Sequence, residues 1–478
     1  MTVLLACAMC GLPRFLEEDG GPYHRGAAAG AAERVRAIDS PLDSGSVGRP
    51  MRAQLVRTAV LEIYEQVRRE GARADQALQR VLRREKQLRS VERRAVSDAV
   101  YGLLRLQGRV DDLLGRALAT RASALAKLAT PTQHLLRYAG YLVIGERQSP
   151  ESAVGLAGPE IAPYRWVLDL LQDPAALGSA SDPVDALAAE TSLPRWLAAL
   201  WQAQLGTGET RALADALNQR APLTVRANLL KNTREELLAT LAAEGHPAQP
   251  TPKSPWGLTF IGRTNVFALK AFKAGLFEVQ DEGSQLIALA CQARPGQLVV
   301  DACAGAGGKT LALAAEMHNK GRLVACDRDA RRLDELRPRA RRAGMHNWEA
   351  RGAPEGPAGE ARIADLIKQA DVVLVDAPCS GLGALRRNPD ARWRLDQGEV
   401  DSFPPRQLQI LQRYSRLVKP GGRLVYATCS INRRENEDVT QRFLESEKEF
   451  EEAAPQTQLL PHRDGTDGFY IAPLRRKA

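Results

Sequence analysis

Residues 298–310 read LVVDACAGAGGKT, a short apolar run followed by a glycine-rich turn and the start of a helical pattern. Gly305, Gly307 and Gly308 allow a tight turn and a close approach of the backbone to a ligand. Three more apolar runs follow, with helical stretches between them: RLVACD (322–327), DVVLVDAP (371–378) and GRLVYATCS (422–430). Strands that are apolar throughout and alternate with helices are typical of a parallel sheet with both faces covered. We therefore expect an α/β domain with a mostly parallel sheet over residues 277–478.

The glycine-rich turn is compatible with two kinds of nucleotide site. Gly308-Lys309-Thr310 fits the end of a phosphate loop, GxxxxGK[ST], but Cys303 stands where that loop needs its first glycine. In a nucleoside site, an acidic residue about 20 residues beyond the glycines binds the ribose hydroxyls. Asp327, at the end of the second apolar run, has this position. NAD would also suit the acid, but the full GxGxxG pattern is missing, so the sequence favours another nucleoside cofactor.

From Arg52 to about residue 220 the chain is predicted to be helical, since apolar residues recur at helical spacing and strand patterns are absent. Residues 52–150 hold 19 lysines and arginines against 10 aspartates and glutamates, an excess equal to the net charge of +9 of the whole chain. A basic module beside a near-neutral remainder suggests a polyanionic partner. A solvated, arginine-rich helical surface explains the charge equally well.

Composition narrows the class of protein. Of 478 residues, 44% are hydrophobic and 26% charged, and no apolar run reaches about 18 residues, so we expect a globular protein without a membrane span. The seven cysteines are too few for a disulfide scaffold, and their one CxxC motif, Cys7 and Cys10, lacks the second pair of a zinc site. We expect a cytoplasmic protein that acts as a monomer and binds no metal.

The expected organisation is a disordered extension (1–50), a helical domain (51–185), a small α+β module (186–276) and the α/β domain (277–478).

Two cysteines stand just past strand-like runs. Cys379 follows Asp376-Ala377-Pro378, and Cys429 lies in a Thr-Cys-Ser sequence. Ligands of an open parallel sheet bind beyond the carboxyl ends of its strands. Asp327, Asp376 and both cysteines should therefore converge at the edge that carries the glycine turn. A lone cysteine is usually a small buried hydrophobe, and we interpret Cys291 and Cys326 in that way.

Two thiols, a carboxylate and a nucleoside cofactor suit methylation at an unactivated pyrimidine carbon. Carbon 5 of cytosine is not nucleophilic, but addition of a thiolate to carbon 6 turns the ring into a reactive enamine. A methyl sulfonium can then supply the methyl group. The proton on carbon 5 must next be removed so that the thiol can leave, and a carboxylic acid near the ring nitrogen assists the addition.

The motifs also resemble a known family. DACAGAGGKT, ACD, DVVLVDAPCSGLG and LVYATCSI, in this order, closely resemble the RsmB/Sun family of RNA 5-methylcytosine methyltransferases, as do VQDEGSQL (279–286) and RRNPDARW (386–393). The resemblance covers roughly residues 190–478, and residues 52–180 resemble the NusB-like RNA-binding domain that precedes the catalytic part of RsmB. It implies a Rossmann-like class I methyltransferase domain behind an all-helical NusB-like domain and a small α+β module. The implied activity is methylation of cytosine in RNA, of the small-subunit (16S) ribosomal type.

The resemblance also implies roles for single residues. Cys429 would be the nucleophile, and Cys379 would assist release of the enzyme after methyl transfer. Asp376 would face the base, and Lys309 would order the site. The residues implied to hold S-adenosylmethionine are Cys303, Ala304, Gly305, Ala306, Gly307, Gly308, Lys309, Asp327 and Asp376.

Two departures from the family pattern bear on cofactor binding. The family turn reads Ala-Pro-Gly-Gly-Lys, whereas this chain has Gly305-Ala306-Gly307-Gly308-Lys309, which keeps small residues and the lysine. The family also has a Gly-Asp that contacts the adenine side, but Ala353 stands in place of the acid, with Glu355 and Asp365 as candidates to replace it.

Other functions stay open at this stage. A transfer RNA or another RNA is the alternative substrate. A non-catalytic RNA-binding assembly factor is favoured by the missing acid and opposed by the two cysteines. A phosphate-loop enzyme is disfavoured by Cys303.

Overall fold

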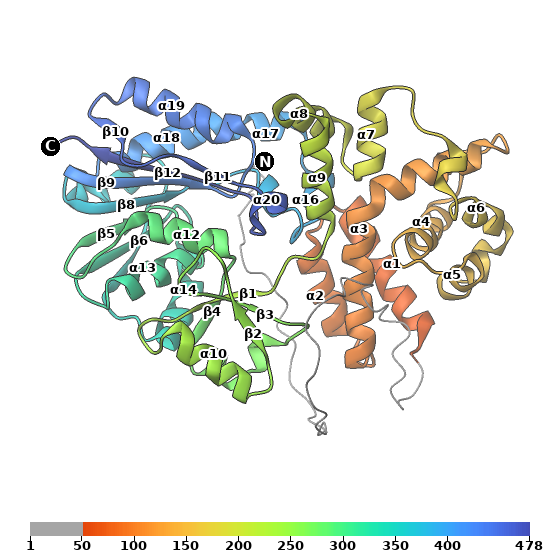
Figure 1. The fold of residues 1–478 in the computed structure, drawn as a ribbon, viewed down its shortest axis with the longest axis horizontal. Coiled ribbons are helices and arrows are strands. Elements are labelled where there is room, and N and C mark those ends of the chain that lie inside the picture. The colour runs from red at the N-terminus through yellow and green to blue at the C-terminus, as the bar shows by residue number, and fades with distance from the viewer. Residues whose placement is uncertain (1–50) are drawn as a thin grey trace. The chain divides into compact units, whose positions relative to one another are not determined.

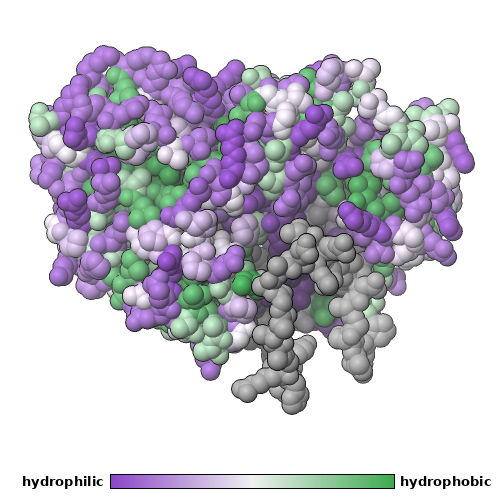
Figure 2. Space-filling model, in the orientation of Figure 1, coloured by the Kyte–Doolittle hydropathy of each residue, from purple (hydrophilic) through white to green (hydrophobic). Residues whose placement is uncertain are grey.

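The computed structural model describes residues 51–478, so the predicted disordered extension, with Cys7 and Cys10, lies outside the described residues (Figure 1). The described chain forms two compact units, residues 51–199 and residues 200–478. Val91 and Ile261 are its exposed large hydrophobic residues. Hydrophilic residues occupy most of the face drawn in Figure 2, because the apolar side chains pack into the cores of the units.

The first unit contains no strand within residues 51–199, as the sequence predicts. Its helices bury an apolar stripe each; α3 buries Val96, Val100 and Leu103 among others. The buried carboxylate of Glu92, in the first turn of α3, accepts hydrogen bonds from Arg52 and Arg89, each at 2.7 Å. The α-helices are α1 (Ala53–Arg69), α2 (Ala74–Arg84), α3 (Ser90–Ala119), α4 (Thr130–Ile144), α5 (Pro150–Ala157), α6 (Arg165–Leu170) and α7 (Pro183–Thr191). Helix α8 (Arg195–Leu205) runs across the division between the units.

The second unit begins with a small antiparallel sheet in the order β2-β3-β1-β4. Its strands are β1 (Thr224–Ala227), β2 (Ala248–Pro250), β3 (Gly257–Phe260) and β4 (Phe277–Val279), and its helices are α9 (Thr207–Asn218), α10 (Arg234–Ala243) and α11 (Lys270–Lys273). Thr233 and Glu236 form a capping box at the start of α10.

The larger sheet has the order β10-β12-β9-β8-β5-β6-β7, with β11 paired to β12. Its parallel strands are β5 (Leu298–Asp301), β6 (Arg322–Asp327), β7 (Trp348–Gly352), β8 (Ala370–Asp376) and β9 (Val418–Thr428). The chain adds β6 and β7 on one side of β5 and then β8 on the other. This places the topological switch point, where open parallel sheets bind ligands, at the carboxyl end of β5.

Helices cover both faces of this sheet (Figure 1). Residues of α12 (Glu282–Cys291), α13 (Gly308–Glu316) and α14 (Ala330–Ala343) belong to one core, and those of α18 (Phe403–Ser415) and α19 (Glu437–Ser446) to the other. The four apolar runs of the sequence are all strands, and the mostly parallel α/β fold is confirmed. Short helices are α15 (Pro357–Ala361), α16 (Ala391–Arg394), α17 (Gln397–Asp401) and α20 (Pro461–Asp464).

Three strands at the C-terminal end were not predicted: β10 (Phe450–Glu452), β11 (Thr457–Leu459) and β12 (Phe469–Arg476). All three pair antiparallel, and β12 joins the edge of β9 over six residue pairs. Within residues 51–478, none of the helices combines the length and the apolar character that a bilayer span requires.

Candidate active site

The glycine turn joins β5 to α13 at the switch point. Gly305 and Gly307 have φ angles of 53° and 82°, in the left-handed region that glycine adopts without strain. A Cβ atom on Gly307 would lie 2.1 Å from Cδ1 and 2.9 Å from Cγ of Leu336, so a side chain there would displace Leu336 of α14. The Ala306 carbonyl accepts a hydrogen bond from Nη1 of Arg339 at 2.7 Å. Helix α14 therefore holds the backbone conformation of the turn.

Asp327 lies at the end of β6, directly beside the turn. Its carboxylate accepts hydrogen bonds from the backbone N–H groups of Gly305 and Asp329, both at 2.9 Å, and the residue is buried. Oδ2 also faces Nη1 of Arg332 at 3.5 Å, whereas Oδ1 keeps a lone pair for a further donor. A ribose hydroxyl is a suitable donor, and the residues present thus fit a nucleoside cofactor.

Lys309 and Asp376 form an ion pair between the first turn of α13 and the end of β8. Lys309 Nζ donates to Asp376 Oδ2 at 2.7 Å. The lysine side chain is 7% exposed and the aspartate side chain 23%. The charge of the lysine is therefore shielded from solvent, whereas the aspartate can still be reached by a ligand.

The side chains of Cys379 and Cys429 touch each other. Their Sγ atoms are 3.2 Å apart, and both residues are buried. The backbones of the two loops are also joined, because the N–H of Gly383 donates to the carbonyl of Cys429 at 2.9 Å. The convergence of the two cysteines that we expect from the strand ends is thus observed.

The other described cysteines have different surroundings. Cys291 and Cys326 are fully buried in the two cores of the larger sheet. Burial raises the pKa of the Cys326 thiol to about 12 and holds the pKa of Cys291 well above its usual value. Cys303 lies in the turn itself, and burial together with the nearby carboxylates raises its thiol pKa as well. These three thiols stay protonated at neutral pH.

No group of three or more His, Cys, Asp or Glu side chains arranged for a metal ion occurs within residues 51–478.

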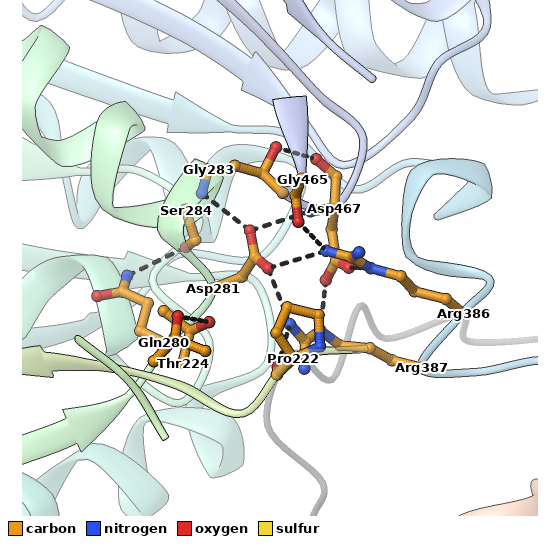
Figure 3. Close-up of polar contacts among 12 residues, drawn as sticks. Pro222, Thr224, Gln280, Asp281, Gly283, Ser284, Arg386, Arg387, Gly465 and Asp467 are labelled. Atoms are coloured by element: carbon orange, nitrogen blue, oxygen red, sulfur yellow. Dashed lines mark hydrogen bonds and ion pairs between the residues drawn. The ribbon is translucent and has the colours of Figure 1, made fainter. Parts of the chain in front are cut away.

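A network of two buried aspartates with two arginines was not predicted (Figure 3). Asp281 accepts from the N–H of Gly283 and from Nη2 of Arg387, both at 2.8 Å. Asp467 is fully buried and pairs with the Nε atoms of both Arg386 and Arg387. The network joins VQDEGSQL to RRNPDARW, two stretches far apart in the sequence. The sequence could not indicate this pairing, because Asp467 lies in a third segment without a recognisable pattern.

The structure places Ala353 and the two candidate acids in different surroundings. Ala353 is buried, and its N–H donates to the Asp327 carbonyl at 2.8 Å. Asp365 is already engaged with Arg351, whose Nη2 lies 2.9 Å from Oδ2. The Glu355 side chain is 80% exposed, with Arg328 3.7 Å away. Glu355 is therefore the acid with more freedom to turn toward a bound ligand.

Asp301, the last residue of β5, leads to a prediction about pH. Its carboxyl group is buried and accepts a hydrogen bond from Thr310 Oγ1 at 2.7 Å, and burial raises its pKa to about 7. The native state therefore holds this proton more tightly than the unfolded chain, whose aspartate pKa is about 3.9. Because the native state binds more protons in this window, its stability falls as pH rises from about 4 to about 7.

Asp301→Asn keeps an oxygen for Thr310 and cannot ionise, so the variant should lose this part of the pH dependence. The slope that it loses is at most about 1.4 kcal/mol per pH unit. Urea unfolding of both proteins between about pH 5 and pH 8 measures it. A constant difference between the two plots of unfolding free energy against pH does not affect the test. Parallel plots would show that Asp301 is ionised in the native state throughout this pH range.

The sheet, the glycine turn and the acid at the end of the next strand define a Rossmann-like domain with a site for a nucleoside cofactor. A family model described as 16S rRNA methyltransferase RsmB/F matches residues 288–475, and a second, described as the ferredoxin-like domain of RsmF/B-like methyltransferases, matches residues 193–267. The chain belongs to this RsmB/F family, and it is an S-adenosylmethionine-dependent methyltransferase.

Individual relatives agree with this assignment. The chain is 30% identical over 449 residues to the probable ribosomal RNA small subunit methyltransferase B of a Synechocystis strain, a match that covers 87% of this chain and 98% of the relative. The crystal structure of the protein PH0851 has a TM-score of 0.72 and 26% identity, covering 90% of this chain and all of that one. A methyltransferase homolog from Pyrococcus horikoshii has a TM-score of 0.54 and 26% identity, covering 62% of this chain and 100% of its own.

Proposed function

We propose that this protein methylates carbon 5 of a cytosine in small-subunit (16S) ribosomal RNA. The observation that carries the proposal is the pair of touching thiols, Cys379 and Cys429, at a sheet edge that also presents Asp376. Relatives named as ribosomal RNA small subunit methyltransferases support the choice of RNA. S-Adenosylmethionine supplies the methyl group as a sulfonium.

In the proposed reaction, the Cys429 thiolate adds to carbon 6 of the cytosine, so that the ring becomes nucleophilic at carbon 5. After methyl transfer, Cys379 assists removal of the proton from carbon 5, and the bond between Cys429 and carbon 6 breaks. This division of roles follows the family resemblance. Asp376 faces the base and assists addition at the ring nitrogen, while Lys309 holds the Asp376 carboxylate in place.

The substrate can be tested by bisulfite sequencing of total RNA from a strain that lacks the gene and from the same strain complemented with it. We expect one cytosine of 16S ribosomal RNA to be protected from conversion only when the gene is present. Protection of a transfer RNA instead would identify the alternative substrate. If no cytosine changes in any RNA, the non-catalytic assembly factor becomes the better description.

The role of Asp327 leads to a prediction about the cofactor. Asp327→Ala removes the carboxylate that we propose binds the ribose and also the acceptor of the Gly305 N–H. A hydrogen bond to a charged group contributes roughly 1.5–3 kcal/mol, so affinity for S-adenosylmethionine should fall about ten-fold to a hundred-fold. Isothermal calorimetry measures the change. Asp365→Ala is the control, because Asp365 is paired with Arg351. Unchanged affinity in Asp327→Ala would remove Asp327 from the site.

We further propose that residues 51–185 form a NusB-like RNA-binding domain, followed by the α+β module (186–276) and the catalytic domain (277–478). Seven lysines and arginines lie between Arg80 and Arg94, and Arg83 and Arg94 are exposed. A basic helical surface of this kind supplies salt-dependent affinity for phosphates. We also propose that the protein acts on its RNA substrate as a monomer in the cytoplasm.

The double variant Arg83→Gln/Arg94→Gln should weaken binding to a ribosomal RNA fragment and leave S-adenosylmethionine binding unchanged. Each lost phosphate contact should reduce the slope of log affinity against log salt by about 0.7–0.9. Fluorescence anisotropy over a range of salt concentrations measures both quantities. Arg442→Gln, on the exposed side of α19, is the matched control. An unchanged slope in the double variant would mean that the helical charge is only a solvated surface.

A further inference from the structure

Each of the two cysteines is followed by a serine, and these serines also meet. Ser380 and Ser430 are both buried, and their Oγ atoms are 3.1 Å apart. The contact between the Cys379 and Cys429 sulfurs, at 3.2 Å, therefore continues into a second contact one residue further along each loop. The two loops follow different strands, β8 and β9, so neither loop alone determines this arrangement.

One buried carboxylate joins the two serines. Glu435 is fully buried, and its Oε1 accepts hydrogen bonds from Ser380 Oγ at 2.5 Å and from Ser430 Oγ at 2.7 Å. Its Oε2 accepts from the backbone N–H of Ser380 at 2.8 Å and from Nε2 of Gln407 at 3.1 Å. Gln407 also donates to the carbonyl of Pro378, directly before Cys379, at 3.0 Å.

The segment that carries Glu435 is fixed on the β9 side as well. The hydroxyl of Tyr426 in β9 donates to the Glu435 carbonyl at 2.6 Å. Nδ2 of Asn436 donates to the Ser430 carbonyl at 3.0 Å, and its Oδ1 accepts from Thr428 at 2.6 Å. The hydrogen bonds that hold the Glu435 carboxylate all come from neutral donors, and burial raises the pKa of this group. A buried carboxyl group is costly unless its hydrogen bonds are made, and here both carboxylate oxygens accept them from the two serines and Gln407.

We propose that Glu435 is a positioning residue of the reaction, which holds the Cys379 and Cys429 loops together through Ser380 and Ser430. The inference rests on the proposed function, in which both thiols must act on the same cytosine ring. One thiol adds to carbon 6, and the other assists removal of the proton from carbon 5. The distance between the two thiols therefore has to be fixed before the cytosine binds. A displacement of about 1 Å can reduce the rate of such a reaction by about a hundred-fold.

Two substitutions of similar volume separate hydrogen bonding from charge. Glu435→Gln can accept from the Ser380 N–H and Gln407 through its oxygen and donate to the two serine hydroxyls through its nitrogen, since a hydroxyl also accepts. Glu435→Leu fills the space but makes none of these bonds. Ser430→Ala removes one of the bonds to the Glu435 carboxylate, together with the bond that the hydroxyl accepts from the Asn432 N–H, and serves if Glu435→Leu does not fold. Glu437→Leu, two residues away and half-buried, is the matched control.

The first readout needs neither RNA nor methyl transfer. Diamide takes two electrons and two protons from Cys379 and Cys429, which become a disulfide while diamide becomes its hydrazine. The rate is measured by peptide mass spectrometry on the full chain. We expect Glu435→Gln and Glu437→Leu to react at least as fast as the unmodified protein, Glu435→Leu at least ten-fold more slowly, and Ser430→Ala in between. Loss of a negative charge alone would favour the thiolates and speed the reaction, so slowing indicates lost positioning.

The second readout is catalysis. Glu435→Leu should lower kcat for methyl transfer by about a hundred-fold without changing affinity for S-adenosylmethionine, and Glu435→Gln should restore most of kcat. Disulfide formation at the unmodified rate in folded Glu435→Leu, or in Ser430→Ala if the former unfolds, would overturn the inference. If the disulfide rates differ as expected but no protein methylates RNA, the positioning role stands and the proposed function falls.

Discussion

Cys429→Ala is expected to yield neither methylated RNA nor a covalent protein–RNA adduct. The variant lacks the thiolate that we propose attacks carbon 6 of the cytosine, so the first chemical step cannot occur. Methyl transfer from labelled S-adenosylmethionine to ribosomal RNA should therefore fall to background. Binding of the cofactor should persist, because the turn residues and Asp327 are unchanged.

Cys379→Ala is expected to behave differently, although the two sulfurs lie only 3.2 Å apart. Attack and methyl transfer remain possible, but release of the product is slowed. A protein–RNA adduct that survives denaturing electrophoresis should then accumulate. Cys326→Ala, a cysteine of the apolar core, is the control and should form methylated product without a stable adduct.

The two variants together decide the assignment of roles. An adduct that accumulates in Cys429→Ala rather than in Cys379→Ala would show that the two cysteines exchange roles. Full activity in both variants would exclude a covalent mechanism. The asymmetry is informative because loss of the attacking group stops the first step, while loss of the release group stops the last.

The sequence predicted the parts of the fold that depend on local pattern. Continuous apolar runs identified four parallel strands, and the carboxyl-end rule placed Cys379 and Cys429 at one edge of the sheet. The antiparallel strand β12 escaped prediction, because its sequence, FYIAPLRR, contains a proline and belongs to no strand–helix alternation. Propensity and spacing along the chain do not reveal which edge a terminal strand joins.

The sequence could not reveal the contacts that position the site. The pairing of Asp281 with Arg387 spans 106 residues, and that of Glu435 with Ser380 spans 55. Each of these residues could pair with many charged or polar side chains, and only the folded structure determines which partner it has. A glutamate in RRENED resembles any solvated charge, and nothing in that run indicates that Glu435 is fully buried while Glu437 is not.

Asp376→Ala is expected to lower both activity and stability. Activity falls because the acid that we propose assists addition at the ring is lost, and general acid catalysis contributes about 10²–10⁴-fold to a rate. Stability falls because Lys309, with a side chain 7% exposed, loses the carboxylate oxygen that lies 2.7 Å from its Nζ. Removing one member of a buried ion pair costs about 3–5 kcal/mol. Because the Asp376 side chain is partly exposed to solvent, we expect a loss of unfolding free energy at the lower end of that range.

The double variant Lys309→Met/Asp376→Ala separates the two effects. Replacing a buried ion pair by apolar groups is often neutral for stability, so the double variant should recover most of the free energy of unfolding lost in Asp376→Ala. Urea unfolding measures that recovery, and methyl-transfer assays on the same preparations should show none, since the acid is still missing. If activity returned together with stability, Asp376 would serve only to neutralise Lys309, and another group would have to assist the attack on the base.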